Sequence, residues 1–597
     1  MPRARKRLND CEGPDELPAS DSEEEYEVCS EAESVDSAEE EAFQQGLDLA
    51  LDREEENTAL LATPPKPTRW RNTNEDDVLP VQHPFAPVRT PGVQLDGHQQ
   101  HTPLELFQLF FDKAAIRDLC NNTNLYAEAK KKKGMKMQWS PVTPLEMHKF
   151  LGLIIYNGLV KATRVQDMWR KDRLHSFPFP ALVMPGHRFW AIFCNLHMSN
   201  TKEDEENDRL KGTAGYDRLC RVKPLMGQLL LACKAYYQPH QNLAIDERMV
   251  ATKARMGLKQ YMKQKSPTCS FKLFVLADSR NGYTSNFSIY QGRGQSRSGK
   301  GLSYDTVMDL LTSASLGTGY HVYMDNFYTS PALFWDLHKN RYGACGTIWE
   351  NRIGFSKTTI NALPKRAARG DIRWIRTGPL LYVKWIDVQE VTVCSTIHKA
   401  YSGETIQRRL KNPDGAWSVQ AIPVPDAVKE YNEYMGGVDL SDALVEHFTV
   451  SKKTMEWYRK LFLHFVDIAV VNSYIIHKEL MQDKQQKTLK QKKFREILCQ
   501  QLVDFGSNEA TTPKKLAPEL VEVLQEPERK PCYPATIVDT SASAKRDRAS
   551  AGRRHCLLCL QRKKYSKTIY KCGYCDVALC IMADRLCFTE WHELMDS

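Results

Sequence analysis

Residues 242–348 alternate short apolar runs with turns and capped helices, and this order limits the possible fold more than any other feature of the sequence. Two of the runs flank the turn Ser-Arg-Asn-Gly, which predicts a β-hairpin. The order of strand, hairpin, helix, strand, helix and strand predicts an α/β fold with a ribonuclease H-like core. The expected elements are strands at 242–246, 271–277, 283–290, 320–324 and 344–348, with helices capped by Ser303 and Ser330 between the later strands.

Two of the predicted strands end in an aspartate, Asp246 and Asp325. In a ribonuclease H-like core, carboxylates from different strands converge at one edge of the sheet. A single aspartate between a strand and a helix is more often a turn or cap residue, so the metal interpretation requires several acids to act together. Asp439 and Asp442 are three residues apart in a predicted helix and therefore share one face, which supplies the further acids.

Four aspartates of this kind suit phosphoryl transfer assisted by two Mg²⁺ ions. Two ions roughly 3.5 to 4 Å apart can activate a nucleophile and stabilise a leaving oxygen, and Mg²⁺ prefers carboxylate oxygens. Two neighbouring acids compete for the same role. Glu247 follows Asp246 directly and is expected to point elsewhere, whereas Asp278 leads into the hairpin turn and is expected to form that turn.

The sequence on either side of this region has other periodicities. Residues 100–240 are predicted to be mainly helical, with two Thr-Pro-x-Glu capping boxes that start at Thr102 and Thr143. The second helix is expected to bury one face. Residues 350–425 are rich in β-branched and aromatic residues, which predicts a β-rich insertion that splits the core. The residues expected on the buried helical face are Leu145, Leu151, Ile154, Ile155 and Leu159.

The charge is distributed unevenly. Residues 21–56 hold sixteen acids and one arginine, so the net charge of +8 combines about −15 here with about +23 in the rest of the chain. Such an excess suits a polyanionic partner such as nucleic acid, although a soluble basic surface explains it equally well. Residues 1–95 combine this acidic tract with Pro-rich sequence and are predicted to be disordered.

The sequence also predicts a nuclear protein that does not enter a membrane. The most apolar run, Leu461–Ile476, is interrupted by polar residues and is too short to cross a bilayer. Basic clusters at Arg3–Arg7 and Lys545–Arg554 resemble nuclear-import signals, which are weak patterns individually.

Cysteines cluster at the C-terminus. Six of the seventeen cysteines lie between Cys556 and Cys587, and two C-x2-C pairs have the spacing that tetrahedral zinc requires. Two zinc ions are expected, but the seven ligands are one short of two complete sites, and His555 is a candidate for the eighth. A RING or PHD-type module is an alternative. The predicted zinc ligands are Cys556, Cys559, Cys572, Cys575, Cys580, Cys587 and His592.

Several sequence blocks together resemble the piggyBac superfamily of DDE/D transposases. The blocks are Leu-Ala-Ile-Asp-Glu, Tyr-Met-Asp-Asn-Phe-Tyr-Thr-Ser-Pro and Tyr-Met-Gly-Gly-Val-Asp-Leu-Ser-Asp, followed by Lys-Lys-Thr-Met-Glu-Trp-Tyr. The resemblance implies cut-and-paste transposition: nicking of transposon ends, hairpin formation and joining of 3′-hydroxyl ends to TTAA target DNA. It implies that Asp246, Asp325 and Asp439 are the catalytic metal ligands and that Asp442 is a supporting acid.

The resemblance also implies contacts with double-stranded DNA. The matching positions are Asn326, Lys452, Lys453 and Trp457; a core aromatic is an equally good interpretation of Trp457. The cysteine-rich segment resembles the family domain that binds terminal inverted repeats, but the stretch between Cys580 and Cys587 is longer than the usual pattern. A homodimer is expected because two transposon ends must be held together.

Two alternatives stay open: a host-domesticated protein that binds DNA or chromatin without cutting it, and a zinc-module interaction protein whose inner acids are structural. The expected organisation is a disordered region at 1–95, a helical dimerisation and DNA-binding domain at 96–241 and 451–530, a catalytic domain at 242–348 and 426–450, a β-rich insertion at 349–425, a linker at 531–553 and a zinc-binding domain at 554–597.

Overall fold

The structure of the 597-residue chain is a computed structural model. It describes residues 69–134, 138–162, 164–170, 177–252, 260–261, 269–292, 297–411, 417–452, 454, 456–506, 534–537, 553–562, 564–573, 577–582 and 586–596. The chain divides into two compact units, residues 1–506 and 507–597, and each unit is described by itself.

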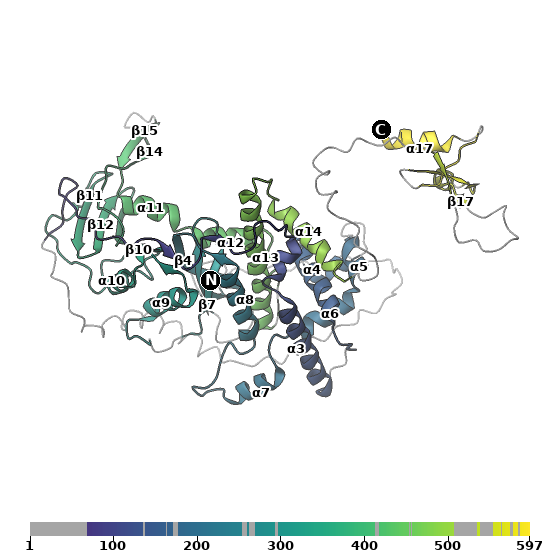
Figure 1. Ribbon diagram of the computed structural model, residues 1–597, viewed down its shortest axis with the longest axis horizontal. Coiled ribbons are helices and arrows are strands. Elements are labelled where there is room, and N and C mark those ends of the chain that lie inside the picture. Colours follow the sequence, from purple (N-terminus) through teal and green to yellow (C-terminus); the bar gives the residue numbers. More distant parts are fainter. Residues whose placement is uncertain are drawn as a thin grey trace, which may run out of the picture. The chain divides into compact units, whose positions relative to one another are not determined.

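A mixed β-sheet forms the centre of the first unit (Figure 1). Eight of its nine strands take the order β11-β12-β13-β10-β9-β4-β6-β5, and the ninth, β7, pairs with β6. Strand β9 runs parallel to both β4 and β10, and the other pairs are antiparallel. The strands are β4 (Asn242–Ala251), β5 (Gln260–Tyr261), β6 (Cys269–Asp278), β7 (Thr284–Ile289), β9 (His321–Met324), β10 (Gly343–Thr347), β11 (Ile372–Thr377), β12 (Leu380–Ile386) and β13 (Glu390–Ser395).

Alternating side chains give the sheet two buried faces. On β4, Leu243 and Ile245 pack into the core beneath helices α9 and α10, whereas Ala244 belongs to the core on the opposite face, with α8, α12 and α13. Period-two alternation explains this division, because successive strand residues point to opposite sides. Asp246 has the same parity as Ala244 and therefore lies on the α12 side of the sheet.

The helices cover the sheet and form a helical region beside it (Figure 1). They are α2 (Pro103–Gln108), α3 (Lys113–Lys132), α4 (Pro144–Val160), the 3-10 helix η1 (Val165–Trp169), α5 (Pro178–Val183), α6 (Gly186–Asn195), α7 (Thr201–Arg209), α8 (Lys223–Ala235), α9 (Leu302–Ala314), α10 (Pro331–Lys339), α11 (Asp426–Tyr434), α12 (Gly437–His447), α13 (Trp457–Asp483) and α14 (Gln491–Val503).

Local sequence signals predicted most helix starts correctly. Both capping boxes are present, at α2 and at α4, where Thr143 Oγ1 accepts a hydrogen bond from Glu146 N at 3.3 Å. Ser330 caps α10 as predicted. The prediction for Ser303 was wrong, because the left-handed backbone of Gly301 (φ +95°) starts α9 at Leu302, one residue before Ser303.

Two further details differ from the sequence prediction. Strand β4 does not end at Asp246; it continues to Ala251 because it pairs with β6 along its full second half, so Asp246 lies within the strand. In α4, Leu151, Ile154 and Ile155 are buried, but Leu145 is 46% exposed because it lies in the first helical turn, beyond the packed face.

The β-rich insertion joins the central sheet instead of forming a sheet of its own. Strand β13 pairs with β10 antiparallel, and β12 and β11 follow outward. A two-stranded hairpin, β14 (Thr405–Lys411) with β15 (Trp417–Pro423), is separate from the sheet. The sequence showed where the strands lie but not which edge they would extend, because pairing partners are a tertiary choice.

Residues 69–95 contact the rest of the first unit at several points, which corrects the expectation that disorder extends to residue 95. Trp70 is buried and donates its indole N–H to the Thr358 carbonyl oxygen at 2.9 Å. The physical reason is that this polar, Pro-rich segment has no core of its own but buries single apolar residues against the sheet. Its short strands are β1 (Ala86–Pro87), paired with β8 (Gly317–Thr318), and β2 (Gly92–Val93), paired with β3 (Tyr237–Gln238). Residues 1–68 lie outside the described residues.

Among the described residues, one helix is long and apolar enough to cross a membrane, α13, the helix that contains the apolar run Leu461–Ile476. Of its most apolar stretch, 94% is buried inside the protein. A buried core helix passes the same test of length and composition, so this is weak evidence for a membrane span.

The second unit is small and built from short elements. Strand β16 pairs with β19, and β17 pairs with β18, both antiparallel. Its elements are β16 (Pro534–Thr536), β17 (Arg554–His555), α16 (Leu557–Gln561), β18 (Lys567–Thr568), β19 (Tyr570–Cys572) and α17 (Cys587–Asp596).

Candidate active site and metal centres

Asp246 in β4 and Asp325, the residue that follows β9, come directly after the last paired residues of two neighbouring parallel strands. In the pairing of β4 with β9, Ile245 is opposite Met324, and the next residues are Asp246 and Asp325. The backbone amides of Glu247 and Phe327 donate hydrogen bonds to Asp246 Oδ1 (2.7 Å) and Asp325 Oδ1 (3.0 Å). The fold therefore brings together two acids that are far apart in the sequence and orients each with a backbone donor.

The third aspartate comes from α12, which packs on the same face of the sheet. A Cβ on Gly437, the first residue of α12, would lie 3.1 Å from Ala244 Cβ on β4. A larger residue at this position would force its neighbours on β4 or in the turn before β7 to shift by a few tenths of an ångström. Asp439 lies in the first turn of α12 and is exposed.

The electrostatics of Asp246 show that the acids share one region. Burial, together with the negative charges of Asp325, Glu247 and Asp439, raises the pKa of Asp246 to about 7, although a backbone hydrogen bond from Glu247 opposes this shift. The pKa of Asp325 is also raised, first by burial and then by the charge of Glu247. Converging carboxylates with raised pKa values are the arrangement that a divalent cation would stabilise.

Among the described residues, the group of ligand atoms that all lie within 4.8 Å of one another is that of four cysteines in the second unit. For the aspartates, the predicted phosphoryl transfer would use two ions roughly 3.5 to 4 Å apart. The donor set of hard carboxylate oxygens fits Mg²⁺.

Asp442 has a partner within the protein. Its carboxylate forms an ion pair with Arg248, which is buried on β4. Burial raises the pKa of Asp442, and the charge of Arg248 opposes this shift. The role of Asp442 as a metal ligand stays a prediction, and this ion pair would compete with it.

Sequence reasoning missed Arg248 and Tyr431 near the acids, whereas it considered Glu247 and expected it to point elsewhere. Arg248 has the same strand parity as Asp246, and this parity was the signal that could have placed it against α12. Glu247 lies on the other face, where it forms an ion pair with Lys272 at 2.5 Å, yet its charge still reaches Asp325. Tyr431 on α11 has a pKa raised to about 12, mainly by burial and also by the charges of Asp325 and Asp246.

The four predicted DNA contacts have different surroundings. Asn326 is half-buried, and its backbone oxygen accepts a hydrogen bond from Arg352 at 2.8 Å. Lys452 Nζ donates to the Ala162 carbonyl oxygen at 2.7 Å. Trp457 begins α13 and is half-buried against the helical core, and Lys453 lies outside the described residues. Contact of these residues with DNA stays a prediction.

A four-cysteine cluster forms in the second unit. Cys556, Cys559, Cys580 and Cys587 are buried, and Cys559 Sγ lies 3.6 Å from Cys587 Sγ and 3.9 Å from Cys580 Sγ. Sulfur atoms bound about 2.3 Å from one tetrahedral zinc are about 3.8 Å apart. The donor set and spacing therefore fit one zinc ion held by the first C-x2-C pair and two later cysteines.

The remaining predicted zinc ligands do not belong to this cluster. Cys572 is buried in β19, and His592 Nδ1 contacts the Phe588 carbonyl oxygen at 2.7 Å. His555 is exposed in β17, and Cys575 lies outside the described residues. A second zinc ion, and the ligand pairing for it, stay predictions.

The raised pKa of Asp246 predicts a dependence of stability on pH. As the pH rises from about 4 to about 7, the unfolded chain loses the Asp246 proton before the folded protein does, so folding stability is lost. Without added Mg²⁺ at pH 8, Asp246→Asn should therefore unfold at a temperature a few degrees higher than wild type. The gain in the free energy of unfolding should be on the order of 1 kcal/mol, because solvent screens the partly exposed side chain. Thermal melts at pH 5 and pH 8 measure this difference.

The difference between Asp246→Asn and wild type should shrink at pH 5 and on addition of Mg²⁺ at pH 8. Asp309→Asn, on the exposed side of α9, is the matched control and should melt like wild type at both pH values. Equal or lower stability of Asp246→Asn at pH 8 would contradict a pKa of Asp246 raised by burial and by the neighbouring carboxylates.

Similarity to known proteins defines the class of protein to which this chain belongs. The family model described as Transposase IS4 matches residues 102–474, a range that contains all four aspartates. The chain is 28% identical over 388 residues to human PiggyBac transposable element-derived protein 3, covering 63% of this chain and 61% of that protein. It is 26% identical over 424 residues to human PiggyBac transposable element-derived protein 2, covering 69% and 67%.

A solved structure has the same fold. The cryo-EM structure of the piggyBac transposase synaptic complex with hairpin DNA superposes with a TM-score of 0.61 at 23% identity, covering 82% of this chain and 98% of that chain. The chain belongs to the piggyBac transposable element-derived protein family and carries an IS4-type DDE transposase domain. The match spans 61% of the length of PiggyBac transposable element-derived protein 3, which is less than two thirds of that protein.

Proposed function

We propose that this protein is a metal-dependent DNA transposase of the piggyBac type, which nicks transposon ends, forms hairpins and joins the 3′-hydroxyl ends to TTAA target DNA. The observation that carries the proposal is the placement of Asp246 and Asp325 on adjoining parallel strands, with Asp439 on the helix that covers them. Three acids from distant segments in one region are what metal-assisted phosphoryl transfer needs.

The topology supports a ribonuclease H-like catalytic core. Strands β7, β6, β4, β9 and β10 are neighbours in this order, with β4, β9 and β10 parallel and the hairpin antiparallel. Aspartates on the first and fourth strands in chain order therefore reach the same edge. This is the arrangement expected from the order of elements in the sequence.

The aspartates would hold the metal ions, and neighbouring groups of the protein would orient the aspartates. Asp246, Asp325 and Asp439 would hold two Mg²⁺ ions, with Asp442 as a supporting acid, and the bound ions would activate the attacking oxygen and stabilise the leaving one. The amides of Glu247 and Phe327 keep the first two carboxylates in place. Arg248 fixes Asp442 and so anchors the second turn of α12 to the sheet.

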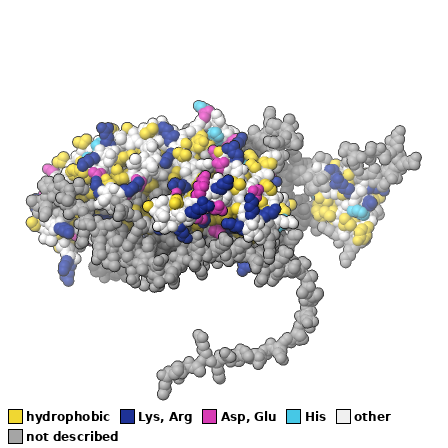
Figure 2. Space-filling model, turned by 90° about the horizontal axis from the view of Figure 1, so that it is seen from below, with side chains coloured by type: hydrophobic (Ala, Val, Ile, Leu, Met, Phe, Trp, Pro, Cys, Tyr) yellow, Lys and Arg dark blue, Asp and Glu magenta, His cyan; other side chains and the backbone are white. Residues whose placement is uncertain are grey.

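Double-stranded DNA is the proposed partner. The solved piggyBac transposase was captured with hairpin DNA, and the excess positive charge outside residues 21–56 suits such a ligand. Among the described residues on the face shown in Figure 2, Lys and Arg side chains are scattered between apolar and acidic ones. Binding of terminal repeats by the cysteine-rich unit, homodimerisation and nuclear localisation are further parts of the proposal.

Cleavage of DNA with candidate terminal repeats at a TTAA junction tests the proposal. Nicks followed by hairpins should form with Mg²⁺ and disappear in buffer without Mg²⁺. An arm without chelator is needed because EDTA also removes zinc from cysteine sites. Binding of the repeats without any cleavage would instead favour the second candidate, a DNA-binding protein that no longer cuts.

A further inference from the structure

The turn that connects β6 to β7 is fixed by one buried carboxylate. Asp278 is fully buried; its Oδ1 accepts a hydrogen bond from Arg280 N (2.9 Å), and its Oδ2 accepts from His240 N (2.8 Å) and His240 Nδ1 (2.9 Å). Arg280 in turn donates to His240 Nε2 at 2.8 Å, which makes Nδ1 the donor to Asp278. The turn is therefore tied both to itself and to the segment before β4.

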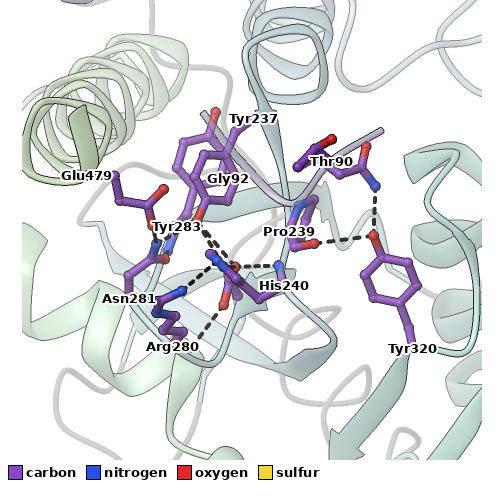
Figure 3. Close-up of polar contacts among 12 residues, drawn as sticks. Thr90, Gly92, Tyr237, Pro239, His240, Arg280, Asn281, Tyr283, Tyr320 and Glu479 are labelled. Carbon is purple, nitrogen blue, oxygen red and sulfur yellow. Dashed lines mark hydrogen bonds and ion pairs between the residues drawn. The ribbon is translucent and has the colours of Figure 1, made fainter. Parts of the chain in front are cut away.

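A second set of contacts ties the same turn to the long helix α13. Asn281 Nδ2 donates to Glu479 Oε1 and to the Tyr237 hydroxyl, both at 2.6 Å, and the Tyr237 hydroxyl donates to Glu479 Oε1 at 2.8 Å. Figure 3 shows Asn281 and Glu479 pointing toward one another beside Tyr237, with Arg280 reaching His240. Tyr237 also stacks on Tyr283, with ring centroids 4.1 Å apart.

Helix α12 rests directly on this turn. Ser279 Oγ donates to the Tyr434 carbonyl oxygen at 2.6 Å, at the end of α11. A Cβ on Gly437 would lie 3.0 Å from Ser279 Cα, and a Cβ on Gly282 would lie 2.9 Å from Ser441 N. The turn therefore touches α12 on both sides of Asp439, at its first residue and at Ser441.

We propose that Asp278, Asn281 and Glu479 are positioning residues for Asp439: through the turn 279–282 they set where α12 presents its carboxylate to those of Asp246 and Asp325. This inference rests on the proposed function of these three acids. Residues that orient metal ligands without touching the metal typically change metal affinity 10- to 100-fold when they are altered. The turn approaches α12 at Gly437, at the Leu440 side chain and at the Ser441 backbone, so its effect would reach Asp439 as a shift of the helix.

Gly282→Ala tests the proposal most directly. Its φ of +77° strains any other residue, and the 2.9 Å approach to Ser441 N means that an added methyl group must change the distance between the turn and α12. Gly212→Ala is the matched control, because Gly212 also has a positive φ (+87°) but nothing lies within 4 Å of its added Cβ. Asn281→Ala is the second variant, since it cuts the tie to Glu479 and Tyr237 at a half-buried position without adding bulk.

The measurement is binding of Mn²⁺ to the zinc-loaded full chain, followed by the EPR signal of free Mn²⁺, and it does not depend on DNA cleavage. Gly282→Ala should weaken Mn²⁺ binding about 10-fold or more relative to Gly212→Ala, and Asn281→Ala should weaken it in the same direction. Melting curves compare the folding of the variants. Mn²⁺ affinity equal to that of Gly212→Ala in both variants would overturn the positioning role.

A different Mn²⁺-binding result would contradict the proposed function itself. If wild type and Asp325→Asn bind Mn²⁺ equally, the acids are not a metal site and there is nothing for the turn to position. If Asp325→Asn loses Mn²⁺ but Gly282→Ala and Asn281→Ala keep it, the metal site stands and only the inference about the turn fails.

Discussion

Asp325→Asn should lower Mg²⁺-dependent nicking of terminal-repeat DNA by at least about 10³-fold, because it removes a carboxylate that would hold the metal ions together with Asp246 and Asp439. A metal ion supplies several kcal/mol to the stabilisation of charge in phosphoryl transfer, and each 1.36 kcal/mol changes a rate tenfold. The folded structure should persist, since the Asn side-chain oxygen can still accept the hydrogen bond from Phe327 N. Single-turnover nicking measures the loss.

The affinity of Asp325→Asn for the same DNA should equal or slightly exceed that of wild type, because the change removes a negative charge. Asp309→Asn is the matched control, an aspartate exposed on α9 whose neutralisation should leave the nicking rate unchanged. Nicking by Asp325→Asn at the wild-type rate would refute the catalytic assignment, even if DNA binding were confirmed.

Cys580→Ser should release one zinc ion per chain and unfold the second unit. Zinc binding to structural cysteine sites supplies apparent free energies of about 10 to 16 kcal/mol, which small modules need in order to fold. Metal analysis gives the stoichiometry, and limited proteolysis should show new cleavage within residues 553–596. The melting temperature of the first unit should stay unchanged.

The zinc content of Cys572→Ser distinguishes a protein with one zinc site from a protein with two. Cys572 is buried but does not belong to the four-cysteine cluster. If the cluster is the sole zinc site, Cys572→Ser keeps the wild-type zinc content, and if the predicted second site exists, the zinc content falls by one. Unchanged zinc in Cys580→Ser would contradict the cluster itself.

Local signals in the sequence predicted the elements well, because helix caps and hairpin turns depend on residues close in the chain. Thr143 with Glu146, Ser330 with Pro331, and the Ser-Arg-Asn-Gly turn all form as expected. The end of β4 was misjudged because its extension beyond Asp246 depends on pairing with β6, about 25 residues further along the chain. Buried partners such as Arg248 were missed for the same reason.

The zinc ligands show a similar division. The C-x2-C spacing predicted the residue type and favoured zinc, since two thiolates at that spacing can bind one tetrahedral ion. The selection of Cys580 and Cys587 to complete the first site required the fold, because several pairings satisfy the same spacing.

The sequence by itself determined which acids were candidates, which metals they suit and the order of strands that could bring them together, since residue chemistry and periodicity are local properties. Only the tertiary structure decided that Asp246 lies next to Asp325, that α12 packs against β4 through Gly437, and that Arg248 forms an ion pair with Asp442. The physical reason is that strand register and close packing of a helix on a sheet are set by contacts between distant segments. No single segment of the chain contains the information about these contacts.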